Sequence, residues 1–250
     1  MNYVTDTYQD LEDRYAATEN YIKQLCSGTI GSLIVNGPPG LGKTHSVETY
    51  LGKYARSRFT VFAGHMSILS LYGTLYHYRS RGDVVVLDDI DSVLTEVHGI
   101  NILKAAMDTK QRRHISWEST THLLKAMGVP TSFDYEGSVI MISNIRDRSE
   151  KKVAAHLQAL KDRAFSITVA DSSKESQFRQ VCFMVLKRGL LSRFSLDTEQ
   201  ELEVLSYLHT NLNKLERISL RTAVKLAQLI QIDPDGWRIM AGSGVLENLD

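Results

Sequence analysis

The spacing of hydrophobic positions divides the chain into two parts. Nearly continuous runs of apolar, often β-branched residues are typical of strands buried on both faces of a parallel sheet. Five such runs occur in the first two-thirds of the chain, at residues 32–36, 59–63, 84–87, 139–143 and 165–169. Helical spacing lies between them, for example at Val153, Leu157, Leu160 and Ala164. The pattern predicts an α/β fold with a doubly wound, parallel five-stranded sheet.

No strand-like run follows residue 170. Three helical segments are predicted there, over 173–187, 198–212 and 220–231. Asp197 and Gln200 form a capping-box pattern at the second segment, and Ser219 precedes the third. The run Asp-Pro-Asp-Gly at 233–236 ends the helical spacing. We therefore expect an α/β core over residues 1–170 and a small all-helical domain over 171–250.

A glycine-rich motif connects the first strand to the next helix. It matches G-x-x-x-x-G-K-[ST], and its residues are Gly37, Pro38, Pro39, Gly40, Leu41, Gly42, Lys43 and Thr44. Small residues let successive backbone N–H groups surround phosphate oxygens, while the lysine reaches the β- and γ-phosphates and the threonine hydroxyl reaches Mg²⁺. These residues, with the adjoining His45, are the predicted nucleotide-binding set.

Two carboxylates follow the third strand. In an enzyme with a phosphate loop these two residues would have different roles. Asp88 would hold the Mg²⁺ shell, and Asp89 would polarise the attacking water. A polar strand end or a helix N-cap also explains such a pair when it stands alone. Its occurrence with the phosphate loop favours catalysis.

These motifs resemble those of the AAA+ ATPase family over nearly the whole chain. Residues 37–44 resemble its Walker A motif and residues 84–89 its Walker B motif. Asn144, after the fourth strand, matches the sensor-1 position, and Arg221 matches the sensor-2 arginine of the lid. The resemblance implies ATP and Mg²⁺ as cofactors, a helical lid, and active sites shared between subunits of a homo-oligomeric ring, expected to be a hexamer. The compact core also resembles ATPases carried by bacteriophages.

The resemblance implies an arginine finger that enters the neighbouring site, and Arg163 lies at its expected place. Arg146 and Arg148 are alternative candidates for this role. Arg163 could instead be a cation that stabilises the C-terminal end of a helix.

The chain departs from the family pattern at Asp89, because many family members have glutamate at this position. No clear polar partner for Asp89 is found at the end of the second strand, where the sequence is Gly-His.

About fifty residues separate the third and fourth strands. A helix is expected over 100–108, and segments 114–118 and 131–137 could pair as an inserted β-hairpin. Formal charges of +3 over residues 104–125 and again over 146–163 could line a nucleic-acid channel, contact an acidic neighbour or be solvated. The sequence Leu-Tyr-Gly at 71–73 resembles a pore loop, although its helical spacing is more typical of a core position.

Composition limits these interpretations. The 250 residues carry 29 basic and 29 acidic side chains, so bulk attraction to nucleic acid or anionic membrane is not expected. Cys26 and Cys182 are too few for a disulfide framework, and no apolar run is long enough to span a bilayer. We expect a soluble, cytoplasmic protein with no metal other than Mg²⁺.

The function predicted from sequence is a Mg²⁺-dependent ATPase that remodels a protein or nucleoprotein partner. Lys43, Thr44 and Asp88 would bind the nucleotide and metal, while Asp89, Asn144, Arg163 and Arg221 would act in hydrolysis. One alternative is a DNA-directed motor, helicase or clamp-loader-like ATPase. Another is a nucleotide-gated scaffold with little hydrolysis.

Overall fold

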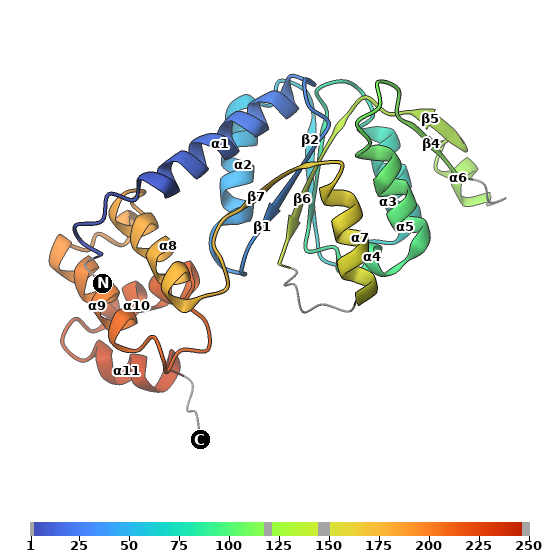
Figure 1. Cartoon of the computed structure of the whole chain (residues 1–250). Coiled ribbons are helices and arrows are strands. Elements are labelled where there is room, and N and C mark those ends of the chain that lie inside the picture. The colour runs from blue at the N-terminus through green and yellow to red at the C-terminus, as the bar shows by residue number, and fades with distance from the viewer. Residues whose placement is uncertain (1–2, 118–121, 145–150, 247–250) are drawn as a thin grey trace. The chain divides into compact units, whose positions relative to one another are not determined.

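The computed structural model describes residues 3–117, 122–144 and 151–246, and its chain forms two compact units (Figure 1). The first, called the core unit, comprises Arg14–Gly37 and Lys43–Val169. The second, called the lid unit, comprises Met1–Asp13, Pro38–Gly42 and Ala170–Asp250. The lid unit therefore includes an N-terminal segment and part of the glycine-rich loop, which sequence patterns alone do not assign to it.

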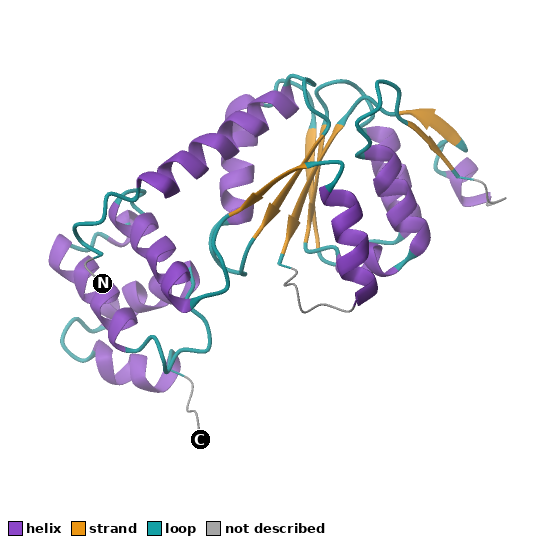
Figure 2. Ribbon diagram, in the orientation of Figure 1, coloured by secondary structure: helices purple, strands orange, loops and turns teal. Residues whose placement is uncertain are grey.

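A parallel sheet forms the centre of the core unit (Figure 2). Its spatial order is β2-β3-β6-β1-β7, and the strands are β1 (Ser32–Asn36), β2 (Phe59–Ala63), β3 (Val84–Asp88), β6 (Ser138–Ser143) and β7 (Phe165–Thr168). Every residue of β1, β3 and β6 is buried, which explains their uninterrupted apolar composition. The predicted five-stranded α/β sheet is confirmed.

Helices cover both faces of this sheet. The helices that lie within the core unit are α2 (Lys43–Tyr54), α3 (Ile68–His77), α4 (Asp91–Thr95), α5 (Val97–Ala106), α6 (His122–Ala126) and α7 (Lys151–Lys161). On one face, Leu71 and Leu75 of α3 and Leu160 of α7 join Leu87 and Met141 of the strands in a single hydrophobic cluster. Burial of this cluster fixes the strands whose ends carry the candidate site.

The insertion after β3 contains the predicted hairpin. Strands β4 (His114–Ser116) and β5 (Ser132–Asp134) pair antiparallel, with Ile115 opposite Phe133. Trp117 and Phe133 each pack edge-on against the ring of Tyr72, at centroid distances of 5.4 and 5.2 Å. The Tyr72 hydroxyl also donates to the Pro130 carbonyl at 3.0 Å. The hairpin is therefore held to the core by α3.

The lid unit is helical, as expected. Its elements are α8 (Lys174–Leu186), a 3₁₀ turn at Ser192–Phe194, α9 (Thr198–Thr210), α10 (Leu220–Ile232) and α11 (Trp237–Gly244). The predicted capping box of Asp197 and Gln200 is present at α9, and the Ser219 side chain accepts from Thr222 N–H at α10. Helix α11 is an additional element, because the chain turns at Asp233 and Gly236 and then resumes a helix with Trp237 fully buried.

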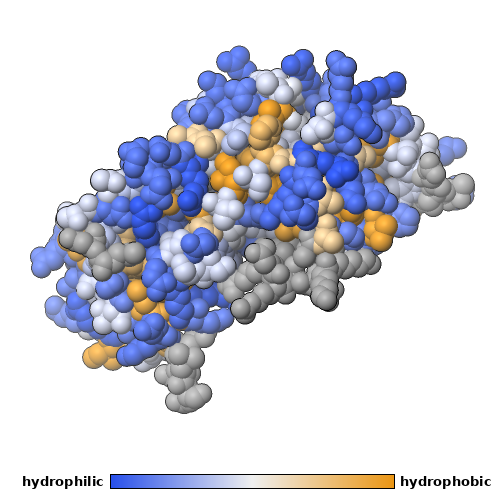
Figure 3. All heavy atoms as spheres, in the orientation of Figure 1, coloured by the Kyte–Doolittle hydropathy of each residue, from blue (hydrophilic) through white to orange (hydrophobic). Residues whose placement is uncertain are grey.

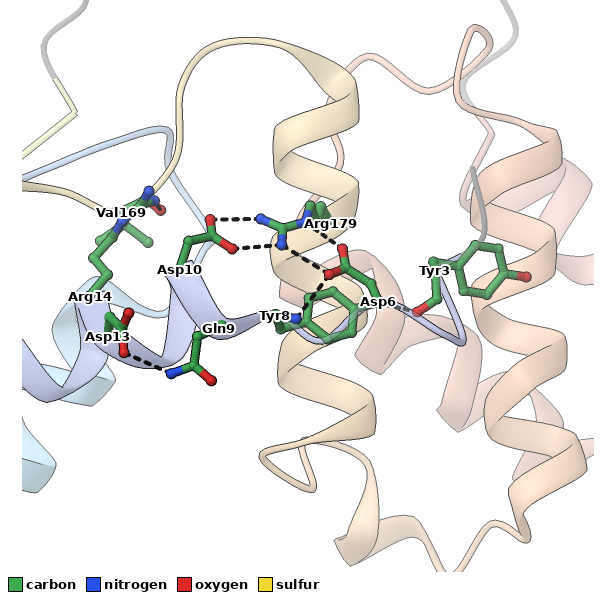
Figure 4. A network of polar contacts seen from close by, with 9 residues as sticks. All are labelled: Tyr3, Asp6, Tyr8, Gln9, Asp10, Asp13, Arg14, Val169 and Arg179. Atoms are coloured by element: carbon green, nitrogen blue, oxygen red, sulfur yellow. Dashed lines mark hydrogen bonds and ion pairs between the residues drawn. The ribbon is translucent and has the colours of Figure 1, made fainter.

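The N-terminal segment is tied to α8 by an ion-pair cluster (Figure 4). Arg179 bonds the carboxylates of Asp6 and Asp10, with shortest distances of 2.6 Å to each. Its guanidinium also lies over the Tyr8 ring. Hydrogen bonds from Arg179 and from the Tyr8 backbone N–H lower the pKa of Asp6. The helix that follows, α1 (Gln9–Cys26), begins in the lid unit and continues into the core unit.

Replacing Arg179 with methionine should destabilise the lid unit in a pH-dependent manner. Because the pKa of folded Asp6 lies below its ordinary value near 3.8, its contribution is present above that value and is lost as pH falls through the folded pKa. Arg179→Met should lower the free energy of unfolding by about 1 kcal/mol at pH 7. Urea unfolding at pH 7 and pH 3 measures this difference, with Arg217→Met, at an exposed pair with Glu216, as control. An equal loss at both pH values would contradict the assignment.

Polar side chains dominate the face drawn in Figure 3, with separate apolar patches among them. Among the residues whose burial is described, the most exposed large apolar side chains are Ile239 (78%) and Ile232 (71%), both in the lid unit. None of the helices within the described ranges combines the length and apolar character that a bilayer span requires.

Candidate functional site

Three strand ends of the core unit bring the predicted side chains together. Strand β6 lies between β3 and β1, and all three strands run parallel. Asp89, Asn144 and the loop after β1 therefore emerge at the same edge of the sheet. Asn144 follows the middle strand, so it occupies the position between the acidic pair and the lysine. The carboxyl edge of an open α/β sheet is where such folds bind ligands.

A chain of hydrogen bonds links Lys43 to Asp89 through Asn144. The buried Lys43 ammonium donates to the Gly37 carbonyl at 2.9 Å and to Asn144 Oδ1 at 2.5 Å. Asn144 Nδ2 donates to both carboxylate oxygens of Asp89. One amide thus contacts both the cation of the glycine-rich motif and the second acidic residue. The contact supplies the polar partner for Asp89 that the sequence did not identify.

Thr44 and Asp88 form a second, adjacent contact. The Thr44 hydroxyl donates to Asp88 Oδ2 at 2.6 Å, and Asp88 is buried. A hydroxyl and a carboxylate are hard oxygen ligands of the kind that Mg²⁺ prefers, and Mg²⁺ usually takes only one or two such protein ligands beside water and phosphate. The donor set fits a magnesium ion bound together with a nucleotide.

Asp89 has a left-handed backbone conformation, with φ of 52°. Its N–H donates to the Ile142 carbonyl at 3.2 Å, so the turn after β3 is tied to β6. Among residues other than glycine, aspartate and asparagine adopt this conformation with the least strain. The backbone therefore gives a physical reason for aspartate, rather than glutamate, at this position.

The glycine-rich loop is closely packed against the start of α10 within the lid unit. Gly40 and Gly42 have φ of 74° and 85°. The Leu220 N–H donates to the Gly40 carbonyl at 2.8 Å, and a Cβ at Gly40 would lie 2.8 Å from the Ser219 Cβ. Gly40 is thus required both by its backbone conformation and by this close approach.

Comparison with curated proteins identifies a phage relative. No family model matches the chain. The chain is 30% identical over 249 residues to an uncharacterized 36.7 kDa protein of the nrdC–mobD intergenic region of Enterobacteria phage T4. The match covers 95% of this chain and 76% of the phage protein. The chain belongs to this phage protein's family.

Solved structures with the same fold are AAA+ P-loop ATPases. RuvB of Thermotoga maritima, in a mutant form, aligns with a TM-score of 0.58 at 14% identity, over 94% of this chain and 70% of RuvB. NtrX of Brucella abortus, in complex with ADP, aligns with a TM-score of 0.55 at 11% identity, over 98% of this chain and 52% of NtrX. The chain therefore has the AAA+ fold, as its motifs predict.

Two of the remaining predicted site residues, His45 and Arg221, are exposed. The His45 side chain is exposed on α2. Arg221 is exposed in the first turn of α10, next to the residue whose N–H bonds Gly40. Arg146 and Arg148 lie outside the described residues.

Arg163 lies at the opposite edge of the sheet. It precedes β7, and its carbonyl accepts from the Ser32 hydroxyl at the start of β1. Its guanidinium donates to the Ala159 carbonyl at 2.6 Å, near the C-terminal end of α7. Because the amino ends of the strands face away from Lys43, Arg163 does not reach the candidate site of its own chain. The observed contact is that of a cation at a helix C-terminus.

Two features suggested by the sequence have a structural role instead. Leu71 and Tyr72 are fully buried in α3, which confirms the core position that their helical spacing favours over a pore loop. Arg113 bonds the Ala106 and Gly137 carbonyls at 2.8 Å, and burial lowers the pKa of its guanidinium. Arg112 is exposed and pairs with Asp134 at 2.8 Å. Two of the positive charges of this region therefore make contacts within or beneath the hairpin.

Proposed function

We propose that this AAA+ protein binds ATP with Mg²⁺ and hydrolyses it. The observation that carries the proposal is the continuous contact from Lys43 through Asn144 to Asp89, beside the Thr44–Asp88 pair. These groups have the chemistry that phosphoryl transfer to water requires: a cation for the phosphates, hard oxygen ligands for the metal and a carboxylate for the nucleophile. Structural relatives with bound nucleotide, such as NtrX with ADP, support the same assignment.

Each side chain has a distinct role in this proposal. Lys43 and the loop N–H groups would hold the triphosphate, while Thr44 and Asp88 would hold Mg²⁺, whose charge would offset that of the phosphate oxygens. Asp89 accepts a hydrogen bond from the attacking water and orients it. Asn144 contacts both Lys43 and Asp89, so it would link the position of the γ-phosphate to that of the carboxylate.

We further propose a homo-oligomeric ring in which Arg163 acts on the site of a neighbouring subunit. Its place at the amino edge of the sheet supports action in trans, because it is remote from Lys43 of its own chain. Release from the Ala159 carbonyl would free the guanidinium to stabilise charge at the γ-phosphate of that neighbour. Arg221 keeps its proposed role as a phosphate-contacting residue.

Mixing two inactive variants tests the action in trans. Arg163→Ala and Lys43→Ala subunits should each be inactive alone. A one-to-one mixture should recover activity at about a quarter of interfaces, where an intact Lys43 site meets an intact Arg163. Phosphate release measures this recovery, and Lys161→Ala, two residues before Arg163 at the end of α7, provides a control that should stay active. Absence of recovery while the rings remain intact would remove Arg163 from the role.

The task that we favour is remodelling of a protein or nucleoprotein partner. A DNA-directed motor is the second candidate, because RuvB of Thermotoga maritima is described as a Holliday junction branch migration motor. Arg113 is half-buried and bonds two backbone carbonyls, and Arg112 pairs with Asp134, which reduces the charge that the insertion offers to DNA. ATPase activity stimulated by duplex DNA, with a steep salt dependence, would favour the motor. A nucleotide-gated scaffold is the third candidate and predicts little phosphate release.

A further inference from the structure

A groove of about 600 Å³ lies between α5 and β4 in the core unit. Asn101, Ile102 and Ala105 line it from the helix, His114 and Ser116 line it from the strand, and Trp117 lines it directly after the strand. Figure 1 shows β4 beside α5, and no residue of β5 lines the groove. The groove therefore follows the edge of β4 that faces away from its partner strand. Its volume is within the range of ligand-binding pockets.

The hydrogen-bonding pattern of the hairpin leaves this edge of β4 open. Trp117 N–H bonds the Thr131 carbonyl and Tyr135 N–H bonds the Arg113 carbonyl, so the odd-numbered positions of β4 face β5. In an antiparallel pair, the main-chain groups of His114 and Ser116 then point outward. Among residues 3–117, 122–144 and 151–246, none bonds those N–H and C=O groups.

An open strand edge beside a groove can accept another strand. Its N–H and C=O groups are spaced two residues apart, and an extended polypeptide is the ligand that offers matching groups at that spacing. Side chains of such a segment would enter the space between β4 and α5. The described residues that line the groove include no lysine, arginine, aspartate or glutamate, which disfavours a phosphate backbone or a charged peptide.

The walls of the groove are held in place by contacts with the core. The Trp117 ring packs against Tyr72, which is fully buried, and Ile115 is buried between its two exposed neighbours. His114 Nδ1 lies 2.8 Å from Asp134 Oδ1, so this imidazole is tied to β5. A docking edge fixed in this manner loses little conformational entropy when a segment binds.

We propose that this groove binds an extended, uncharged segment of a partner protein, which adds a third strand to the β4–β5 hairpin. The site lies in the core unit, and none of its lining residues belongs to the contacts around Lys43. The inference therefore goes beyond ATP hydrolysis and does not depend on it. It identifies a surface by which the protein could hold a client or an adaptor.

A labelled peptide tests the proposal directly. The probe is fluorescein-Lys-Thr-Val-Thr-Val-Thr-Val-Lys, in which the six central residues form the uncharged segment and the two end lysines only keep it soluble. Its anisotropy is followed during titration with the full chain without nucleotide. Ser116→Pro removes an outward N–H but no bond of the hairpin, and it should weaken binding roughly tenfold. Ser132→Pro places the same change at the paired position on the outer edge of β5 and should leave binding unchanged.

Two further variants and a modified probe distinguish binding in the groove from misfolding of the hairpin and from ATP binding. Ala105→Tyr fills the groove from α5, leaves the hairpin backbone intact and should also weaken binding. The probe with N-methylated alternate amides should bind poorly if main-chain pairing holds it. Lys43→Ala should retain peptide binding while losing ATP, so failure of one proposal is distinguishable from failure of the other.

Two results would overturn the proposal. One is failure of the wild-type chain to bind the probe, or equal binding by all variants. The other is loss of self-association in Ser116→Pro without any binding of the probe, which would assign the edge to a second copy of the chain.

Discussion

Lys43→Ala is expected to abolish ATP binding. The ammonium is buried at the start of α2, and each charge-assisted hydrogen bond to phosphate contributes about 1.5–3 kcal/mol. Loss of two such bonds, about 3–6 kcal/mol, corresponds to an affinity weaker by roughly 100-fold to more than 10,000-fold. Titration calorimetry with ATP and Mg²⁺ measures the change.

A lysine elsewhere on the same helix provides the matched control. Lys53 is exposed and pairs with Glu19 at 2.6 Å, so Lys53→Ala removes the same side chain from α2 without altering the site. It should bind ATP as the wild type does. Retention of tight ATP binding by Lys43→Ala would show that the glycine-rich motif is not a phosphate loop.

Asp89→Asn is expected to bind ATP and fail to hydrolyse it. Asparagine accepts the left-handed backbone as readily as aspartate, and its carbonyl can still accept from Asn144. The substitution therefore removes the charge with little change in geometry. Loss of a general base or water-orienting carboxylate slows hydrolysis by about 10²–10⁴-fold. Single-turnover kinetics at saturating ATP measure this rate, and an unchanged rate would remove the catalytic role of Asp89.

Local sequence patterns predicted the strands, the capping box and the phosphate-loop motif. These features depend on neighbouring residues, such as the run before Asp88 or the spacing from Asp197 to Gln200. The inserted hairpin was also predictable, because alternating residues around Ile115 and Phe133 have strand period. Helix α11 was not, because Gly236 provides no side-chain cap that would mark its start.

Contacts between residues that are far apart in the sequence could not be predicted from the sequence alone. The bond from Asn144 to Asp89 spans 55 residues and depends on the placement of β6 between β3 and β1. A count of charges treats Arg113 as a surface cation, whereas its guanidinium bonds two carbonyls beneath the hairpin. Likewise, no local pattern pairs Arg179 with Asp6 across 173 residues. Each depends on the order of strands or helices in space.

Phosphate release from bound ATP, measured in one turnover, tests the central claim most directly. Wild-type protein with Mg²⁺ should release phosphate. Asp89→Asn should bind ATP as tightly as the wild type does and should release phosphate at least about 100-fold more slowly. Chelation of the metal should abolish the wild-type reaction. Tight ATP binding by both proteins, with no faster release from the wild type, would contradict the assignment of Lys43, Asn144 and Asp89 as a hydrolytic site.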